Sequence, residues 1–303
     1  MSNVILGGAI ADSLGMPFES KPADNFLLLS WDGKSYLGSE SHKLNPGQWT
    51  DDTQFSCQLA KSLIENDGFN PDDLAKRYVE LFTSKTIRGY GLTTKAAIDN
   101  LISGVHWSNS GVFGSYGNGT AMRVSPIGIY FRNDLTQLIE AATIDAKITH
   151  NSDEAVAGSI AIAMTAALAC NNDTDNLLER LCEIIPDSKV KVVIHSLSAI
   201  INSPHINAAQ ALKIIGTRAD VRETVPAALF CFLKFNNYHE AVECIIRAGF
   251  DTDTGGSITA ALISAKYGIK CIPKYMVETI EDSEKLIILD SQLYNRSNKS
   301  FFN

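Results

Sequence analysis

The chain has 303 residues, of which 45% are hydrophobic and 20% are charged, and this balance excludes a largely disordered protein. Its formal net charge of −8 at pH 7 argues against broad binding to nucleic acid or to an anionic membrane, because either requires a basic face. A small anionic ligand is compatible with this charge, since metal ions or backbone amides can supply local positive potential.

The N-terminal segment MSNVILGGAIADSLG has no basic start, and Asp12 interrupts its apolar run, so it does not match a signal peptide. The most apolar window, residues 155–169, is shorter than the roughly twenty residues that a membrane span needs. The six cysteines include no CxxC pair, which favours buried free thiols in a reducing compartment. We therefore expect a soluble cytoplasmic protein that does not enter a membrane, and we expect it to be a monomer.

Apolar residues three and four positions apart dominate the chain from end to end. The helices that this spacing predicts cover residues 4–15, 54–65, 71–82, 93–103, 135–147, 153–170, 174–185, 190–201, 208–215, 224–235, 238–248, 255–266 and 273–281. Asn70 before Pro71 is typical of a helix start, Gly249 of a helix end, and Pro226 suits a first helical turn. No strand–helix–strand unit and no linker emerges, so the sequence predicts a single all-α domain over residues 1–303, with about a dozen helices.

The stretch between residues 19 and 48 differs from the rest, because it is rich in Ser, Gly, Pro and Asn and lacks helical spacing. Its length suggests a functional loop. Glu19 stands at its start, directly after the first predicted helix. On its own this residue could simply be a solvated acid.

Two clusters of aspartate and threonine each open a predicted helix. The first is WTDDT, with Thr50, Asp51 and Asp52, and the second is DTDTGG, which begins at Asp251. Helix capping explains either cluster alone, because acids are favoured in a first turn. If the two helix starts meet, however, four carboxylates would repel one another unless cations compensate. Their hard oxygen atoms select Mg²⁺, Mn²⁺ or Ca²⁺ over Zn²⁺, so the pair predicts a site for one or two metal ions.

Two further stretches are candidate binding segments. SYGNGTAMR, at residues 115–123, has glycines that let a ligand approach the backbone, and successive amides can hold a diphosphate. It lacks the preceding strand and the third glycine of a dinucleotide-binding signature, and an ordinary glycine turn is the competing interpretation. His150, in THNS, precedes the alanine-rich helix; a lone histidine there is more often structural than catalytic.

These pieces, in this order, resemble the ADP-ribosylglycohydrolases, the family of dinitrogenase-reductase-activating glycohydrolase and the ADP-ribosylhydrolases. The segments that carry the resemblance are GAIADSLGMPFE (8–19), WTDDT (49–53), SYGNGTAMR (115–123), THNS (149–152) and GFDTDTGG (249–256). WTDDT together with DTDTGG is the most specific part. The chain departs from many members at Ala11, where they have glycine, and we expect this to affect packing more than chemistry.

The resemblance implies a compact orthogonal multi-helix fold and a hydrolase that cleaves at C1″ of ADP-ribose, in an ADP-ribosylated protein or a small ADP-ribose conjugate. A nucleic acid would be a partner only as a modified end. The implied ligands of two Mg²⁺ or Mn²⁺ ions are Thr50, Asp51, Asp52, Asp251, Asp253 and Thr254. The implied substrate-binding residues are Ser115, Tyr116, Gly117, Asn118, Gly119, Met122 and His150. The candidate acid/base residues are Glu19, Asp51 and Asp52, with the aspartates orienting a water.

Other classes fit less well. A prenyl-synthase-like Mg²⁺ enzyme would need DDxxD, but DDTQF lacks the third acid, and HD-type phosphohydrolases need a His-Asp dipeptide that the chain does not have. The same fold could serve as a non-catalytic ADP-ribose binder or a crystallin-like structural protein, although the intact acids favour catalysis. The sequence leaves open whether the bond cleaved is to arginine, serine, another ADP-ribose, a nucleic-acid end or a metabolite.

Overall fold

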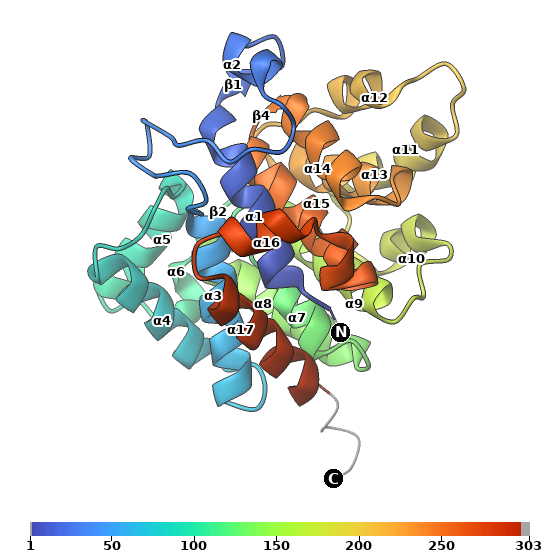
Figure 1. Ribbon diagram of the computed structural model, residues 1–303. Coiled ribbons are helices and arrows are strands. Elements are labelled where there is room, and N and C mark those ends of the chain that lie inside the picture. The colour runs from blue at the N-terminus through green and yellow to red at the C-terminus, as the bar shows by residue number, and fades with distance from the viewer. Residues whose placement is uncertain (1, 298–303) are drawn as a thin grey trace.

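The computed structural model describes residues 2–297, and their regular secondary structure is almost entirely α-helical, as predicted (Figure 1). In chain order these are α1 (Val4–Gly15), α2 (Phe26–Ser30), α3 (Asp51–Glu65), α4 (Pro71–Thr83), α5 (Leu92–Ile102), α6 (Trp107–Ser110), α7 (Ser125–Tyr130), α8 (Leu135–Thr149), α9 (Asp153–Cys170), α10 (Leu177–Ile184), α11 (Lys189–Ile201), α12 (Ala208–Ile215), α13 (Val221–Lys234), α14 (Tyr238–Arg247), α15 (Thr252–Tyr267), α16 (Lys274–Thr279) and α17 (Ser283–Arg296).

Each predicted helix has a counterpart, and the predicted bounds match those of α1, α9 and α12. Helices α2, α6, α7 and α17 were not predicted from the sequence. The expectation for Pro226 was wrong, because this residue lies inside α13 rather than in its first turn. The helix begins earlier than predicted because the Asp220 side chain accepts a hydrogen bond from Arg222 N and so caps it.

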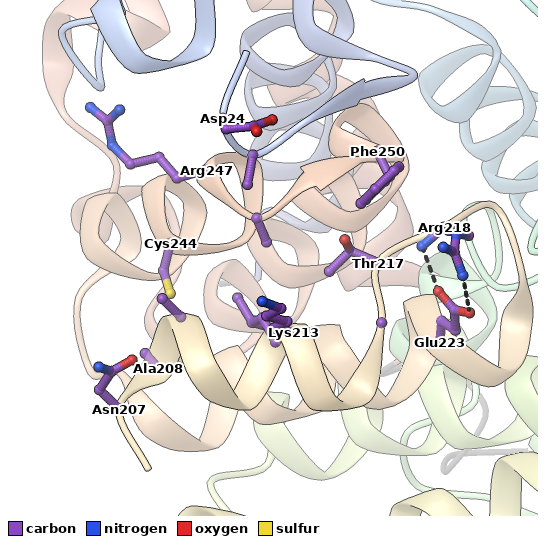
Figure 2. Close-up of a pocket in the computed structure, with 15 residues that line it drawn as sticks. Asp24, Asn207, Ala208, Lys213, Thr217, Arg218, Glu223, Cys244, Arg247 and Phe250 are labelled. Carbon is purple, nitrogen blue, oxygen red and sulfur yellow. Dashed lines mark hydrogen bonds and ion pairs between the residues drawn. The ribbon is translucent and has the colours of Figure 1, made fainter. Parts of the chain in front are cut away.

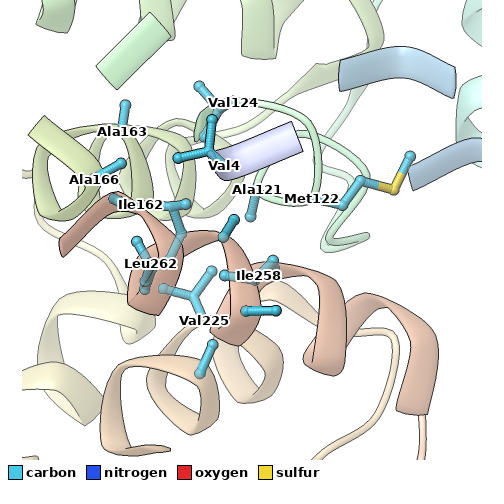
Figure 3. Close-up of a cluster of buried hydrophobic side chains, with 14 of the residues drawn as sticks. Val4, Ala121, Met122, Val124, Ile162, Ala163, Ala166, Val225, Ile258 and Leu262 are labelled. Carbon is cyan, nitrogen blue, oxygen red and sulfur yellow. The ribbon is translucent and has the colours of Figure 1, made fainter. Parts of the chain in front are cut away.

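The core forms around α1 and α15, which pack along each other and are covered by α3, α9, α13, α14 and α17 (Figure 1). Figure 3 shows part of this core, a single cluster to which Val4 of α1, Ile162 of α9, Val225 of α13 and Ile258 of α15 all belong. Helix α9 is long and apolar enough to cross a membrane, but 83% of that stretch is buried inside the protein. It is therefore a core helix, as the sequence predicts. The six cysteines are free thiols, with Cys57 and Cys231 buried and the others partly exposed.

The end of α1 lies directly against the start of α15. A Cβ atom added at Gly15 would lie 2.3 Å from the carbonyl oxygen of Thr252, so only glycine allows this approach. The hydroxyl of Thr252 also donates to the carbonyl oxygen of Gly15 at 2.8 Å. This contact fixes Asp253 and the following turn of α15 beside the segment that carries Glu19.

Two pairs of very short strands hold loops in place. Strand β1 (Lys21–Pro22) runs antiparallel to β4 (Gly249–Phe250), which ties the chain just after Glu19 to the residues before α15. Strand β2 (Val112–Phe113) runs parallel to β3 (His150–Asn151), which ties the start of the glycine-rich segment to the end of α8. Both pairs therefore attach predicted site residues to helix ends.

Candidate active site

The starts of α3 and α15 meet at a cavity of about 450 Å³, so the condition for a shared acidic site is fulfilled. Glu19 reaches this cavity from one side and the end of α8 from another. The predicted site residues that line it are Glu19, Thr50, Asp51, Asp52, Gly117, Asn118, Gly119, Met122, His150, Asp251, Asp253 and Thr254. Segments that are up to 235 residues apart in the chain thus contribute to one site.

The start of α3 is capped by a residue from another helix. Asp12 of α1 accepts hydrogen bonds from the backbone N–H of Thr50 and Thr53 and from both hydroxyls, at 2.6–3.2 Å. Thr50 makes no capping hydrogen bond with its own side chain. Helix capping therefore does not explain Asp51 and Asp52. Both are buried, with 9% and 2% of their surface exposed, although acids in a first turn are normally solvated.

The start of α15 is held in a similar way by its neighbours. The backbone N–H of Asp251 donates to the carbonyl oxygen of Thr217 at 2.9 Å, and the Asn118 amide donates to the Asp251 carboxylate. The hydroxyl of Thr254 donates to Asp52 Oδ2 at 3.3 Å, which joins the two acidic clusters directly. Glu19, Asp251 and Asp253 each offer an oxygen within 4.8 Å of the others.

This concentration of carboxylates is not balanced by protein cations. Burial, followed by the neighbouring carboxylates, raises the pKa of Asp51, Asp52 and Asp253 well above the ordinary value. Burial also raises the pKa of Asp251. At the acidic site, His42 forms an ion pair with Glu19. Within residues 2–297, no lysine or arginine forms an ion pair with Asp51, Asp52, Asp251 or Asp253.

The residues present fit a divalent cation site. The buried atom Asp52 Oδ1 has no hydrogen-bond partner, although a buried carboxylate oxygen normally has one. It belongs to a set of carboxylate and hydroxyl oxygens, which are the donors that Mg²⁺ and Mn²⁺ prefer. Metal ions would supply both the missing partner and the missing positive charge.

The other part of the cavity is lined by the glycine-rich segment and His150. Gly117 and Gly119 face the His150 ring, since Cβ atoms added there would lie 2.9 Å from its Nε2 and 3.0 Å from its Cε1. Two predicted residues of this segment do not line the cavity. Ser115 bonds the Thr93 hydroxyl at 3.1 Å, and the half-exposed Tyr116 ring lies under the Arg222 guanidinium.

The cavity also includes residues that the sequence did not reveal. They are His42, Ala219 and the segment before and into α5, namely Gly89, Tyr90, Gly91, Leu92, Thr93 and Thr94. His42 Nε2 lies 2.9 Å from Glu19 Oε2, while Ser39 and Ser41 hydroxyls lie 3.1 and 3.2 Å from its Nδ1. The hydrogen bond to Glu19 is the main cause that raises the pKa of His42. In the sequence, Asp12 stands out only as part of the segment GAIADSLGMPFE. Its capping role becomes apparent only when α1 and the start of α3 are placed together.

A second and larger cavity, of about 980 Å³, lies between α12, α14 and the β1–β4 pair (Figure 2). Its arginines are engaged within the protein: Arg218 pairs with Glu223 at 3.6 Å, and Arg247 pairs with Glu243 at 2.7 Å. Its apolar lining includes Phe250, which lies next to Asp251 in the chain. No acidic cluster forms there within the described part of the chain.

If the cavity binds ADP-ribose, as the resemblance implies, replacing Gly119 with valine should weaken that binding by about tenfold or more, because overpacking a close contact typically costs about 1–3 kcal/mol. A Cβ there would also lie 3.2 Å from the Thr94 hydroxyl, so the branched side chain must displace His150 or Thr94. Turnover should fall through weaker substrate binding. Calorimetry with ADP-ribose measures this, and Gly119→Ala should give an intermediate loss. Normal binding by the valine variant would contradict the assignment.

Comparison with known proteins agrees with the all-helical fold. The family model described as ADP-ribosylglycohydrolase matches residues 2–301. The chain is 33% identical over 297 residues to an uncharacterised protein from Archaeoglobus fulgidus, with 96% of this chain and 95% of that protein covered. It is 26% identical over 343 residues to ADP-ribosylhydrolase ARH3 from Xenopus tropicalis, with 96% and 95% covered.

A solved structure described as an ADP-ribosylglycohydrolase-related protein complex superposes on this one with a TM-score of 0.81 at 25% identity. The match covers 97% of this chain and 96% of that one. The all-helical architecture is thus shared with a protein described as related to ADP-ribosylglycohydrolases. The chain belongs to the ADP-ribosylglycohydrolase family.

Proposed function

We propose that this chain is a metal-dependent hydrolase that cleaves the glycosidic bond at C1″ of ADP-ribose, in an ADP-ribosylated protein or a small ADP-ribose conjugate, and releases ADP-ribose. The observation that supports this most strongly is the junction of the two acidic clusters. Asp52 and Thr254, from different helices, are in hydrogen-bond contact at 3.3 Å in a cavity that also holds Glu19 and His150.

The residues that line the cavity divide into a cation-binding part and a substrate-binding part. Thr50, Asp51, Asp52, Asp251, Asp253 and Thr254 would hold two Mg²⁺ or Mn²⁺ ions. When bound, such ions would neutralise the carboxylates, orient sugar hydroxyls and lower the pKa of a bound water. Asp12 and Asn118 keep Thr50 and Asp251 in place through buried hydrogen bonds. The backbone at Gly117 and Gly119, together with the neighbouring His150, would bind the diphosphate side of the substrate.

The ribose side of the cavity carries the candidate acid/base groups. Cleavage at C1″ develops positive character on the ribose ring, so carboxylates near it stabilise that charge. Glu19 is 36% exposed at its side chain and is held by His42, whereas the aspartates are buried, so it can exchange a proton with a leaving group more readily. Asp51 or Asp52 would orient the attacking water.

Incubation with a panel of defined conjugates tests this function. The panel carries ADP-ribose on arginine, on serine, on a second ADP-ribose, on a nucleic-acid end and on a small metabolite such as acetate. We expect release of ADP-ribose from at least one of them with Mg²⁺ or Mn²⁺ and none after chelation. The linkage that reacts identifies the substrate. Binding of ADP-ribose without turnover of any conjugate would instead favour the non-catalytic binder.

A further inference from the structure

A row of fully buried polar side chains lies behind the substrate-binding part of the cavity. It runs from Tyr78 of α4 through Asp145 of α8 to Arg123, and from there through Thr149 to His150. Tyr78, Arg123, Asp145 and Thr149 have no exposed surface, and His150 is 2% exposed. Such a buried network is costly unless its members are hydrogen-bonded, so its direction can be worked out from the donors and acceptors.

Arg123 sets the direction of this network because a guanidinium can only donate. Its Nε donates to both carboxylate oxygens of Asp145 at 3.1 Å, and its Nη1 donates to the carbonyl oxygen of Gly119 at 2.9 Å. Its Nη2 donates to the carbonyl oxygen of Asp145 and to Thr149 Oγ1, both at 2.9 Å. The guanidinium also lies over the Phe55 and Tyr78 rings. The Thr149 oxygen is therefore an acceptor toward Arg123.

The hydroxyl proton of Thr149 then has a single possible acceptor among the described residues. The other hydrogen-bond partner of Thr149 Oγ1 among the described residues is His150 Nδ1, at 2.8 Å. If Nδ1 carried a proton and donated it, the buried threonine proton would be left without an acceptor, which is unfavourable. The satisfied arrangement has Thr149 donating to an unprotonated Nδ1, and a neutral imidazole with a bare Nδ1 carries its proton on Nε2.

The second ring nitrogen lies at the cavity wall, beside Gly117 and Gly119. Nε2 has no hydrogen-bond partner within residues 2–297, and because both neighbours are glycines, neither places a side chain over this edge of the ring. Burial, followed by the positive charge of Arg123, lowers the pKa of His150 to about 3, so the ring is neutral at physiological pH. It therefore offers one N–H donor to whatever occupies this part of the cavity.

We propose that Thr149 is a positioning residue: its hydroxyl, oriented by Arg123, holds His150 as the neutral imidazole with its proton on Nε2, which donates a hydrogen bond to an acceptor oxygen of the ADP-ribose part of the substrate. The identity of that ligand depends on the proposed function, whereas the state of the ring does not. A nitrogen that carries a proton cannot bind a metal ion, so His150 serves the substrate and not the metal site.

Nitrogen-15 NMR of the histidine side chains measures the state of the ring directly. The chain has six histidines, and the signals of His150 are identified by their loss in His150→Gln. We expect the ring to show a protonated Nε2 and an unprotonated Nδ1 that do not change between pH 5 and pH 8. In Thr149→Val, which keeps the branched shape but removes the hydroxyl, the pure Nε2–H pattern should be lost, and Thr149→Ser should restore it. A ring with its proton on Nδ1, or a charged ring at pH 7, would overturn the assignment.

Calorimetry with ADP-ribose then tests whether Thr149 acts through His150. Loss of a fixed hydrogen bond should weaken binding by about tenfold in Thr149→Val, and Thr149→Ser should stay within a few-fold of the wild type. In a His150→Ala background, Thr149→Val should cause no further loss, because the two residues act in series. Thr165→Val is the matched control, since Thr165 is also buried but bonds only the carbonyl oxygen of Ala161 in its own helix.

Failure of the positioning role of Thr149 and failure of the proposed function give different results. Independent, additive losses in Thr149→Val and His150→Ala would overturn the positioning role even if the enzyme is active. A correct Nε2–H ring in a protein that neither binds ADP-ribose nor cleaves any conjugate would contradict the proposed function and the proposed ligand, while leaving the assigned ring state intact. Comparison of melting temperatures shows whether any variant is simply misfolded.

Discussion

Replacing Asp253 with alanine is expected to abolish hydrolysis and to lower the affinity for Mg²⁺ or Mn²⁺, because this residue joins Asp251 and Glu19 at the centre of the acidic group. Asp253 is buried at the start of α15, and its Oδ1 accepts a hydrogen bond from the N–H of Thr254. The rest of that helix is fixed by its packing on α1, so we expect the fold to survive the substitution. Metal titration by calorimetry and a turnover assay measure the two effects.

The stability of this variant should change in the opposite direction from its activity. Without metal, Asp253 is desolvated and faces like charges, which is why its pKa is raised well above the ordinary value. Removing it should leave the metal-free protein as stable as the wild type or more stable. Added Mg²⁺ at 100 times its Kd should stabilise the wild type by about 2.7 kcal/mol and the variant by much less.

Glu240→Ala is the matched control for Asp253→Ala, because Glu240 is also an acid in the first turn of a helix but is exposed. It should change neither metal affinity nor turnover. Unchanged metal affinity in Asp253→Ala, or a melting temperature of the wild type that does not respond to chelation and added metal, would show that the clusters do not form a metal site.

The sequence predicted the larger helices because their apolar residues recur three and four positions apart, and it missed short ones for physical reasons. Helices α2 and α6 have too few residues to show a repeat, and all of α7, SPIGIY, is buried, so no polar side marks its period. Helix α17 is different. Its buried residues Leu286, Leu289 and Leu293 lie three and four apart, so this helix could have been identified from the sequence.

The composition of the acidic clusters predicted a metal site, but only on the assumption that the two clusters lie close together in the fold. It depends on Gly15, which lets α1 touch α15, and on Asp12, which binds the start of α3 to α1. The family resemblance supplied the expectation that these segments converge. The structure shows the contact itself, through Thr254 and Asp52.

Residues that orient the site from outside the acidic clusters left no pattern to detect. His42 lies 23 residues after Glu19, in a stretch without helical or strand spacing, and nothing in the sequence pairs the two. Thr149 stood beside His150 in the quoted motif, yet its role depends on Arg123, a side chain from another segment that the fold buries behind it. Sequence reasoning found the acidic groups of the site and missed the roles of Asp12, Arg123 and Thr149, which orient its residues.

Replacing Glu19 with glutamine is expected to lower turnover by about a hundredfold or more if Glu19 is the general acid/base. The substitution keeps the size of the side chain and an oxygen that can accept from His42, 2.9 Å away, but it removes the exchangeable proton. Affinity for ADP-ribose should change little, because Glu19 is not one of the residues around His150 and the glycine-rich segment. Single-turnover rates and product binding measure the two effects separately.

The position of Glu19 beside Asp251 and Asp253 requires a second measurement, because an acid there could also be a metal ligand. If Glu19 acts through its proton, Glu19→Gln should keep most of its metal affinity at saturating Mg²⁺ and still lose the rate. If it acts as a ligand, excess metal should restore much of the rate. Glu40→Gln is the matched control, since Glu40 is an exposed acid in the same loop and should behave as the wild type. Loss of ADP-ribose binding with the rate retained would show that Glu19 belongs to the binding part of the cavity and that the acid/base group must be sought among Asp51 and Asp52.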